Sequence, residues 1–198
     1  MKAAVRKRYD AVVIGVSSGG LAALSTILPI LPGDFPVCII VVQHQSPGAD
    51  DFLAKHLNAL CSLDVREAQD KDVLTPGTVY IAPPNYHLLV EPGGTLALSL
   101  EPKVNYSRPS VDVLFETAAD AFADRLVGIV LTGANNDGAG GFKRIKEFGG
   151  LTIVQSPDTA QVDTMPIAAI EAAVPDHTLP LDAIAPFLKN MFRGTTDE

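Results

Sequence analysis

The stretch VVIGVSSGG, Val12 to Gly20, is the part of the 198-residue chain that decides the fold. An apolar run ends at Ile14, and a glycine turn that contains Ser17 and Ser18 follows it. This pattern is typical of a buried strand that turns tightly into a helix. Such a turn can hold a cofactor's phosphate groups or can present a nucleophilic serine. The rest of the sequence favours one of these two uses.

Apolar runs and helical patterns alternate on either side of this turn, as they do in parallel α/β sheets. The predicted strands of such a sheet are residues 10–15, 37–44, 126–133 and 151–155. The predicted helices are residues 21–28, 50–60, 111–122, a segment ending near Phe148, 166–173 and 181–192. Leucine spacing predicts buried helix faces made of Leu21, Leu24 and Leu28 in the first helix and of Leu53, Leu57 and Leu60 in the second.

The middle of the chain has a different pattern. Prolines and glycines separate the short runs TVYIAPP (78–84), HLLVEPGG (87–94) and TLALSLEP (95–102), which predict hairpin-like strands. Ser110 is then the predicted N-cap of a helix. We therefore expect a doubly wound, mostly parallel α/β sheet with helices on both faces and a short antiparallel β insertion at one edge. Its expected bounds are residues 10–192, with tails at 1–9 and 193–198.

Composition excludes several classes of protein. The net charge of −8 argues against a general nucleic-acid binder, which would present a basic face. No apolar run approaches the ~20 residues of a membrane span, and no secretion signal precedes Asp10. Cys38 and Cys61 lie in apolar stretches, which favours free thiols in a cytosolic protein over a disulfide.

Three predicted strands are followed by residues that can do chemistry together. Ser17 follows the first strand, His44 ends the second, and Asp137 lies in TGANNDGAGG after the third. Parallel strands collect such groups at their carboxyl ends. Histidine can take the serine proton, and a carboxylate can orient the imidazole, so these residues predict a Ser-His-Asp triad for acyl transfer.

Each residue also has a structural interpretation. Ser17 alone would more often be a helix cap, His44 could be a buried structural histidine, and NDG at Asp137 is common in turns. A dinucleotide site is disfavoured because Ser17 replaces its second glycine and no acidic residue ends the second strand. A P-loop is disfavoured because no lysine follows the glycines.

Three further histidines and one arginine remain. His56, His87 and His177 lack ligand-like spacing, so no metal site is expected. Arg108, just before a predicted helix, could contact an anionic substrate or could simply fix a loop.

Six blocks of the sequence resemble, in order, the catalytic domain of the chemotaxis protein-glutamate methylesterases (CheB). They are VVIGVSSGGLAAL, VVQHQSPGADDFLAKHLN, VYIAPPNYHLLVE, SRPSVDVLFETAA, GIVLTGANNDGAGGFKRIKEFGGLTIVQ and MPIAAIEA, and they extend from about Asp10 to Phe192. The resemblance implies hydrolysis of γ-glutamyl methyl esters on the cytoplasmic helices of chemoreceptors, with deamidation of certain glutamines and with no metal or organic cofactor. It places the catalytic serine, histidine and aspartate at Ser17, His44 and Asp137.

The resemblance also implies an oxyanion contact from the backbone amide of Ala134, while Ser18 is expected to shape the turn. It implies a cytoplasmic, monomeric catalytic domain. The family's usual N-terminal receiver domain does not appear before Asp10, which leaves regulation by a separate receiver protein open. Two alternatives are a catalytically silent module that binds receptors or signalling proteins, and a nucleotide-binding α/β protein suggested by the glycine turn alone.

Overall fold

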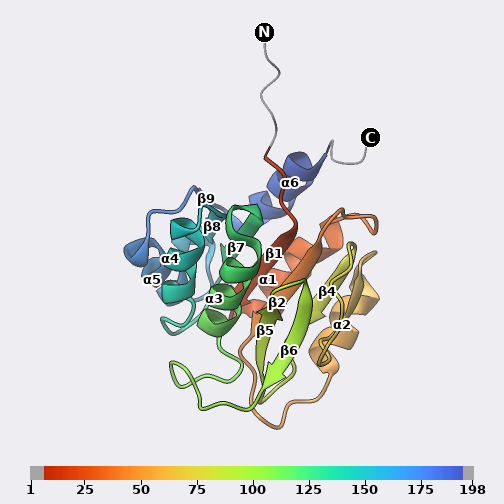
Figure 1. Ribbon diagram of the computed structural model, residues 1–198. Coiled ribbons are helices and arrows are strands. Elements are labelled where there is room, and N and C mark those ends of the chain that lie inside the picture. Colours follow the sequence, from red (N-terminus) through yellow and green to blue (C-terminus); the bar gives the residue numbers. More distant parts are fainter. Residues whose placement is uncertain (1–6, 194–198) are drawn as a thin grey trace.

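The computed structural model describes residues 7–193, which form a parallel β-sheet covered by helices on both faces (Figure 1). Residues 1–6 and 194–198, which make up much of the two predicted tails, lie outside the described residues. The main sheet has the spatial order β3-β4-β2-β1-β7-β8-β9, and every neighbouring pair of strands is parallel. The predicted fold class is therefore confirmed.

The strands of the main sheet are β1 (Ala11–Val16), β2 (Cys38–Gln43), β3 (Asp64–Glu67), β4 (Thr78–Ile81), β7 (Leu126–Val130), β8 (Leu151–Gln155) and β9 (His177–Leu179). Two further strands, β5 (His87–Glu91) and β6 (Thr95–Ser99), form a separate antiparallel hairpin. The α-helices are α1 (Gly20–Ile27), α2 (Phe52–Leu60), α3 (Val111–Phe122), α4 (Ala139–Glu147), α5 (Thr164–Ala172) and α6 (Leu181–Phe192). Short 3₁₀ helices cover Leu28–Ile30, Ala123–Arg125 and Pro157–Thr159.

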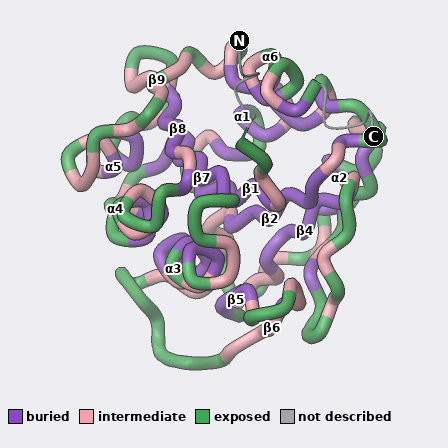
Figure 2. The backbone as a smooth tube through the Cα atoms, turned by 45° about the horizontal axis from the view of Figure 1, so that its top comes forward, coloured by how far each residue is buried: buried purple, intermediate pink, exposed green. Residues whose placement is uncertain are grey.

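The sheet separates two hydrophobic cores. Alternate residues of β1 and β2 face α1, α2 and α6 on one side, and α3, α4, α5 and the β5–β6 hairpin on the other. Figure 2 shows the central strands buried between these two layers. Both faces are covered, which explains why β1 and β2 are continuous apolar runs rather than alternating ones.

Two details of the predicted β insertion are wrong. Thr78–Ile81, expected in a hairpin, is β4 and pairs in parallel with both β2 and β3. The hairpin itself, β5–β6, does not extend the edge of the main sheet, because Leu88, Val90 and Leu96 pack in the core beneath α3. The alternating pattern correctly indicated strands, but it carried no information about their partners.

The predicted helix faces need smaller corrections. Leu21 and Leu60 are exposed, whereas Ala23 and Ile27 complete the buried face of α1. Ser110 does occupy the N-cap position of α3, but its side chain makes no capping hydrogen bond. Its hydroxyl is used elsewhere, as described below.

Both cysteines are free thiols, as predicted. Burial raises the pKa of Cys38 to about 12 and that of Cys61 to about 11. Cys38 is buried in β2, and Cys61 is only partly buried after α2.

Across residues 7–193, none of the helices is both long enough and apolar enough to cross a membrane.

Candidate active site

The turn after β1 lies at the point where the order of the strands reverses. β1 pairs with β2 on one side and with β7 on the other, and in open α/β sheets ligands bind beyond the carboxyl ends of strands at such a point. The backbone continues this pairing past the strand ends, since Ser17 N donates to Thr132 O (3.0 Å) and His44 N donates to Val16 O (3.1 Å). Ser17 therefore lies beside His44 at the end of the sheet.

Gln43 ties the ends of these two strands together. Its Nε2 donates to the carbonyl oxygens of both Ser17 and His44, each at 2.9 Å. The side chain fits only because residue 20 is a glycine, since a Cβ there would lie 1.7 Å from Gln43 Oε1. The amide of Gln43 thus fixes the spacing of the Ser17 and His44 backbones.

The Ser17 hydroxyl does not cap α1. The N-cap of that helix is Gly19, in the left-handed region with φ 83°, and the helix has no side-chain capping hydrogen bond. Ser17 itself is half-buried and leaves its side chain available for other contacts. The structural explanation that the sequence favoured for this serine alone is therefore wrong.

The structure brings the His44 and Asp137 side chains together. His44 Nε2 donates to Asp137 Oδ2 at 2.7 Å, and the Asp137 side chain is fully buried. Because this hydrogen bond places the proton on Nε2, Nδ1 is the nitrogen left to act as a base. Among residues 7–193, no hydrogen bond joins the Ser17 hydroxyl to the His44 ring, and catalytic contacts of this kind often tighten only when substrate binds.

Asp137 is held in place by the start of α3. Its carboxylate accepts hydrogen bonds from the backbone N–H of Val111 (2.7 Å) and Asp112 (3.2 Å), and from Ser110 Oγ (2.7 Å). A carboxylate at a helix N-terminus is favoured by the unpaired N–H groups and by the helix dipole. Asp137 therefore acts as the cap that the Ser110 side chain was expected to provide.

The pKa of Asp137 reflects two opposing effects. Burial alone would raise it, but hydrogen bonds from His44, Ser110, Val111 N and Asn105 hold the pKa below its usual value. Asp137 is therefore ionised at neutral pH and can both orient the His44 ring and stabilise its protonated form.

Two residues of the site were not predicted from the sequence. Asn135 lies in the same loop as Asp137, with Nδ2 3.4 Å from His44 Nδ1 and with Oδ1 accepting from Asp137 N (3.1 Å). Asn105 Nδ2 lies 3.2 Å from Asp137 Oδ1. Asn135 could have been found from its place two residues before Asp137, whereas Asn105 is 32 residues away and has no such signal in the sequence.

The remaining predicted site residues occupy varied positions. Ser18 is exposed, and its carbonyl accepts a hydrogen bond from Thr132 Oγ1 (2.8 Å), which helps to shape the turn. Ala134 is exposed in the loop after β7, and no hydrogen bond in the described part of the chain uses its N–H. Arg108 donates to Asn85 Oδ1 and to the carbonyls of Leu100 and Glu101, which are loop-fixing contacts.

An open hollow of about 440 Å³ lies directly beside the Ser17 turn. It is lined by Ser17, Gly19, Gly20, Leu21, Ala22, Gln43, Gln45, Leu53 and Gln161. These lining side chains are small, apolar or amide, and none of them is charged, so the hollow can accept an uncharged, flexible side chain of a substrate. The hollow gives a substrate a way to reach the serine.

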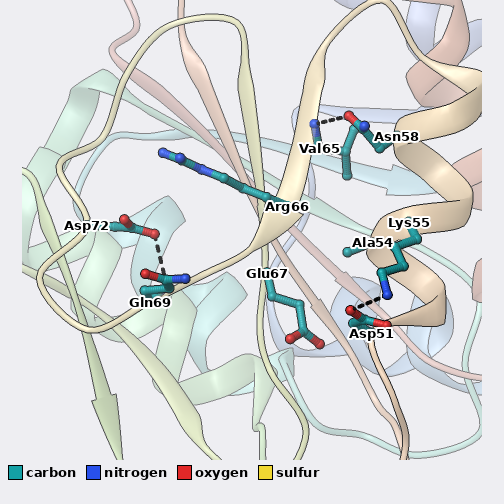
Figure 3. A pocket seen from close by; sticks show the side chains of 9 residues that line it. All are labelled: Asp51, Ala54, Lys55, Asn58, Val65, Arg66, Glu67, Gln69 and Asp72. Atoms are coloured by element: carbon teal, nitrogen blue, oxygen red, sulfur yellow. Dashed lines mark hydrogen bonds and ion pairs between the residues drawn. The ribbon is translucent and has the colours of Figure 1, made fainter.

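Two other hollows lack this chemistry. One of about 350 Å³ lies between α2, β3 and the loop that follows, where Lys55 pairs with Asp51 at 2.8 Å (Figure 3). Its described lining contains carboxylates, two cations and amides, but no serine, cysteine or histidine. The other, about 1140 Å³, lies at the amino ends of the strands, near Asp10, Cys38 and Leu151. Its lining includes Cys38 and His177, but these begin β2 and β9, which are separated by β1, β7 and β8 in the sheet, so the thiol and the imidazole do not form a pair.

The ligand sets that bind metal ions in proteins have no counterpart among the described residues. Within residues 7–193, no group of three or more histidine, cysteine, aspartate or glutamate side chains is arranged to hold a metal ion.

Known proteins resemble the chain over most of its length. The sequence profile of the CheB methylesterase family matches residues 12–188. A relative from Leptospira interrogans is 51% identical over 177 residues, which cover 89% of this chain and 92% of that protein. A protein-glutamate methylesterase/protein-glutamine glutaminase from Symbiobacterium thermophilum is 42% identical over 174 residues, which cover 88% of this chain and 48% of that protein.

The fold agrees with this sequence similarity. The crystal structure of the Thermotoga maritima CheB methylesterase catalytic domain matches with a TM-score of 0.88 and 37% sequence identity. The match covers 92% of this chain and 98% of that one. The chain belongs to the CheB methylesterase family.

Proposed function

We propose that the protein hydrolyses γ-glutamyl methyl esters on chemoreceptors to glutamate and methanol, with Ser17, His44 and Asp137 as its catalytic triad. The observation that carries this proposal is the buried Asp137–His44 hydrogen bond of 2.7 Å beside the Ser17 turn. Membership of the CheB methylesterase family, and the names of relatives such as the Symbiobacterium protein, support the choice of ester.

The acylation half of the reaction starts at Ser17. His44 Nδ1 takes the proton of the Ser17 hydroxyl, and Oγ attacks the ester carbonyl to give a tetrahedral intermediate. Ionised Asp137 stabilises the imidazolium that forms. As the intermediate collapses, the C–O bond to the methoxy group breaks, His44 returns the proton to that oxygen, and methanol leaves.

The second half releases the product. His44 takes a proton from water, the hydroxide attacks the acyl-serine carbonyl, and the bond to Ser17 Oγ breaks as that oxygen is reprotonated. The free acid of the glutamate side chain then leaves. The N–H of Ala134, which donates no hydrogen bond within the described residues, is the proposed oxyanion donor, and because the donor is a backbone group, the small side chain at this position does not remove it.

The same site would deamidate glutamine side chains, with ammonia replacing methanol as the leaving group. The proposed protein substrates are the methylated cytoplasmic helices of chemoreceptors, and with them we propose that the enzyme acts in the cytoplasm. A monomeric state is proposed from the family resemblance alone. Control by a separate receiver protein is consistent with this proposal. Arg108 remains a candidate substrate contact, although its side chain is engaged in loop-fixing hydrogen bonds.

The experiment is methanol release from methylated receptor by the wild type, Ser17→Ala and Ser18→Ala. Loss of the triad serine should lower kcat by at least ~10³-fold. Ser18→Ala is the matched control, because this exposed neighbour lies in the same turn and should retain most of the activity. Full activity of Ser17→Ala would refute the mechanism. Absence of turnover by the wild type, together with retained receptor binding, would favour the silent binding module.

A further inference from the structure

A second buried carboxylate, Asp112, lies beside Asp137 and has no place in the mechanism above. Asp112 is 9% exposed and Asp137 is 1% exposed. Asp137, in the loop before α4, accepts from Asp112 N at the start of α3 (3.2 Å), and Asp112 Oδ1 accepts from Gly141 N in α4 (2.7 Å). The Asp137 carboxylate therefore holds the start of α3, which contains Asp112, and the Asp112 carboxylate holds the start of α4, which follows Asp137, so the two negative charges lie close together.

One amide bridges the two carboxylates. Asn105 Nδ2 donates to Asp112 Oδ2 at 2.6 Å and to Asp137 Oδ1 at 3.2 Å. An amide nitrogen carries two hydrogens, so it can serve both acceptors at once. In the described part of the chain, no other side chain donates a hydrogen bond to both carboxylates.

Asn105 reaches this position from a tight surface turn. Val104 and Ser107 exchange two backbone hydrogen bonds of 3.1 and 2.8 Å, and the residues between them, Asn105 and Tyr106, have φ of 49° and 63°. Positive φ at both central positions defines a type I′ turn, in which asparagine is favoured at the first position. Both residues lie at the exposed surface, but Tyr106, 98% exposed, extends into solvent, whereas the Asn105 amide turns back onto the two carboxylates.

The electrostatics of the pair explain why a donor is needed there. Burial raises the pKa of Asp112 and the charge of Asp137 raises it further, against hydrogen bonds from backbone N–H groups and from Asn105. Asp137 keeps a lowered pKa despite burial, and Asn105 is one of the groups that hold it down. The other titratable groups around the pair are Glu116 of α3, Arg144 of α4, His44 after β2 and His87 of β5.

We propose that Asn105 is a positioning residue, which holds the Asp137 carboxylate toward His44 by bridging it to the Asp112 carboxylate. This inference rests on the proposed function of the Ser17–His44–Asp137 site. Without the bridge, the two carboxylates repel each other and share a proton at a higher pH than they do in the wild type. A protonated Asp137 can no longer stabilise the imidazolium that His44 becomes during acylation.

The test uses Asn105→Gly, which removes the amide but keeps a residue that accepts positive φ, so that the turn itself is retained. The acid limb of the pH profile of kcat/KM for ester hydrolysis should move to higher pH. At a pH just above the wild-type acid limb, kcat should fall by about tenfold with little change in KM. Tyr106→Asn is the matched control in the same turn, and a small methyl ester is used as the substrate for all variants.

A second variant separates positioning from a general loss of structure. In Asn105→Gly/Asp112→Asn one of the two charges is gone and the new amide lies next to Asp137, so both kcat and the acid limb should return toward wild type. An unchanged pH profile for Asn105→Gly would overturn the proposal. A loss of activity that Asp112→Asn does not restore, with the profile unmoved, would overturn it equally.

A measurement that does not depend on enzymatic activity tests the role of Asn105 separately from the proposed function. The side-chain carboxyl of Asp137 can be titrated by carbon NMR in the wild type and in Asn105→Gly, and it should titrate at a higher pH in the variant. If the wild type hydrolyses no ester but this shift is seen, the proposed function fails and the role of Asn105 stands. If ester is hydrolysed and no shift is seen, Asn105 is not a positioning residue.

Discussion

Gly20→Ala should damage both stability and activity, although alanine normally improves a helix. A Cβ at this position would lie 1.7 Å from Gln43 Oε1 and 2.8 Å from Val16 Cγ2. Gln43 cannot move aside without giving up the hydrogen bonds of Nε2 to the Ser17 and His44 carbonyls. The perturbation is therefore transmitted to both strand ends that carry the proposed nucleophile and base.

The expected size follows from these contacts. Overpacking a buried site costs about 1–3 kcal/mol, and each of the two broken hydrogen bonds costs about 0.5–1.5 kcal/mol. The better helix propensity of alanine offsets about 1 kcal/mol of this loss. We expect a net loss of about 1–5 kcal/mol in the free energy of unfolding. Displacement of Ser17 relative to His44 should lower kcat/KM by about 10²-fold.

Urea unfolding and methanol release measure the two effects. Gly48→Ala is the matched control, because a Cβ at Gly48 meets no atom within 4 Å and should leave stability and activity close to wild type. Gln43→Ala removes the closer of the two clashing side chains and leaves the Val16 Cγ2 contact at 2.8 Å, so adding Gly20→Ala to it should cost less than Gly20→Ala costs in the wild type. If Gly20→Ala is as stable and as active as Gly48→Ala, the hydrogen bonds of the Gln43 amide do not hold the Ser17 and His44 backbones in place.

Four further outcomes are expected. Asp137→Asn should lower kcat on the order of 10⁴-fold in methanol release, because an amide cannot stabilise the His44 imidazolium. Although burial opposes it, hydrogen bonding lowers the folded-state pKa of Asp137. The resulting stability is complete above the unfolded pKa of about 3.9 and is lost as pH falls through the folded value. Urea midpoints should therefore fall more steeply on acidification for wild type than for Asp137→Asn, and parallel slopes would contradict this. The raised pKa values of Cys38 and Cys61 predict slow reaction with a thiol reagent in the native state and fast reaction after denaturation, and fast native labelling of Cys38 would argue against its burial. Arg108→Ala should lower Tm, because two hydrogen bonds to the Asn85 side chain and two to the Leu100 and Glu101 carbonyls are lost. A large increase in KM, measured at a temperature where the variant is still fully folded, would instead support a role for Arg108 as a substrate contact.

Long apolar runs made the centre of the fold predictable. β1, β2, β7 and β8 are largely buried on both faces, so each is built around an apolar run, which polar residues interrupt only at Gln43 in β2 and at Thr152 and Gln155 in β8. The edge strands were missed because β3 and β9 are short and largely open to solvent, and DVRE and HTL carry no apolar run. For Thr78–Ile81 the sequence indicated a strand correctly but its partners wrongly, since pairing depends on contacts that are distant in the chain.

The candidate site residues that follow the strands directly could be predicted from the sequence. His44 and Asp137 meet because parallel strands end at a common edge, which strand order alone implies. Asn105 and the hydroxyl of Ser110 were not predicted, because their positions depend on the path of a loop and on the docking of α3 against α4. Only the folded chain shows that Asp137 takes over the capping of α3 and that two carboxylates share one amide.

The central claim is that Ser17 is the nucleophile. The most direct measurement is to treat the wild type, Ser17→Ala and His44→Ala with a fluorophosphonate that phosphonylates activated serines, and to locate the adduct by peptide mass spectrometry. We predict one adduct on Ser17 in the wild type, none in Ser17→Ala, and much slower labelling in His44→Ala, in which Ser17 has lost its base. An adduct on Ser18 or on another serine, or equally fast labelling of Ser17 without His44, would contradict the account.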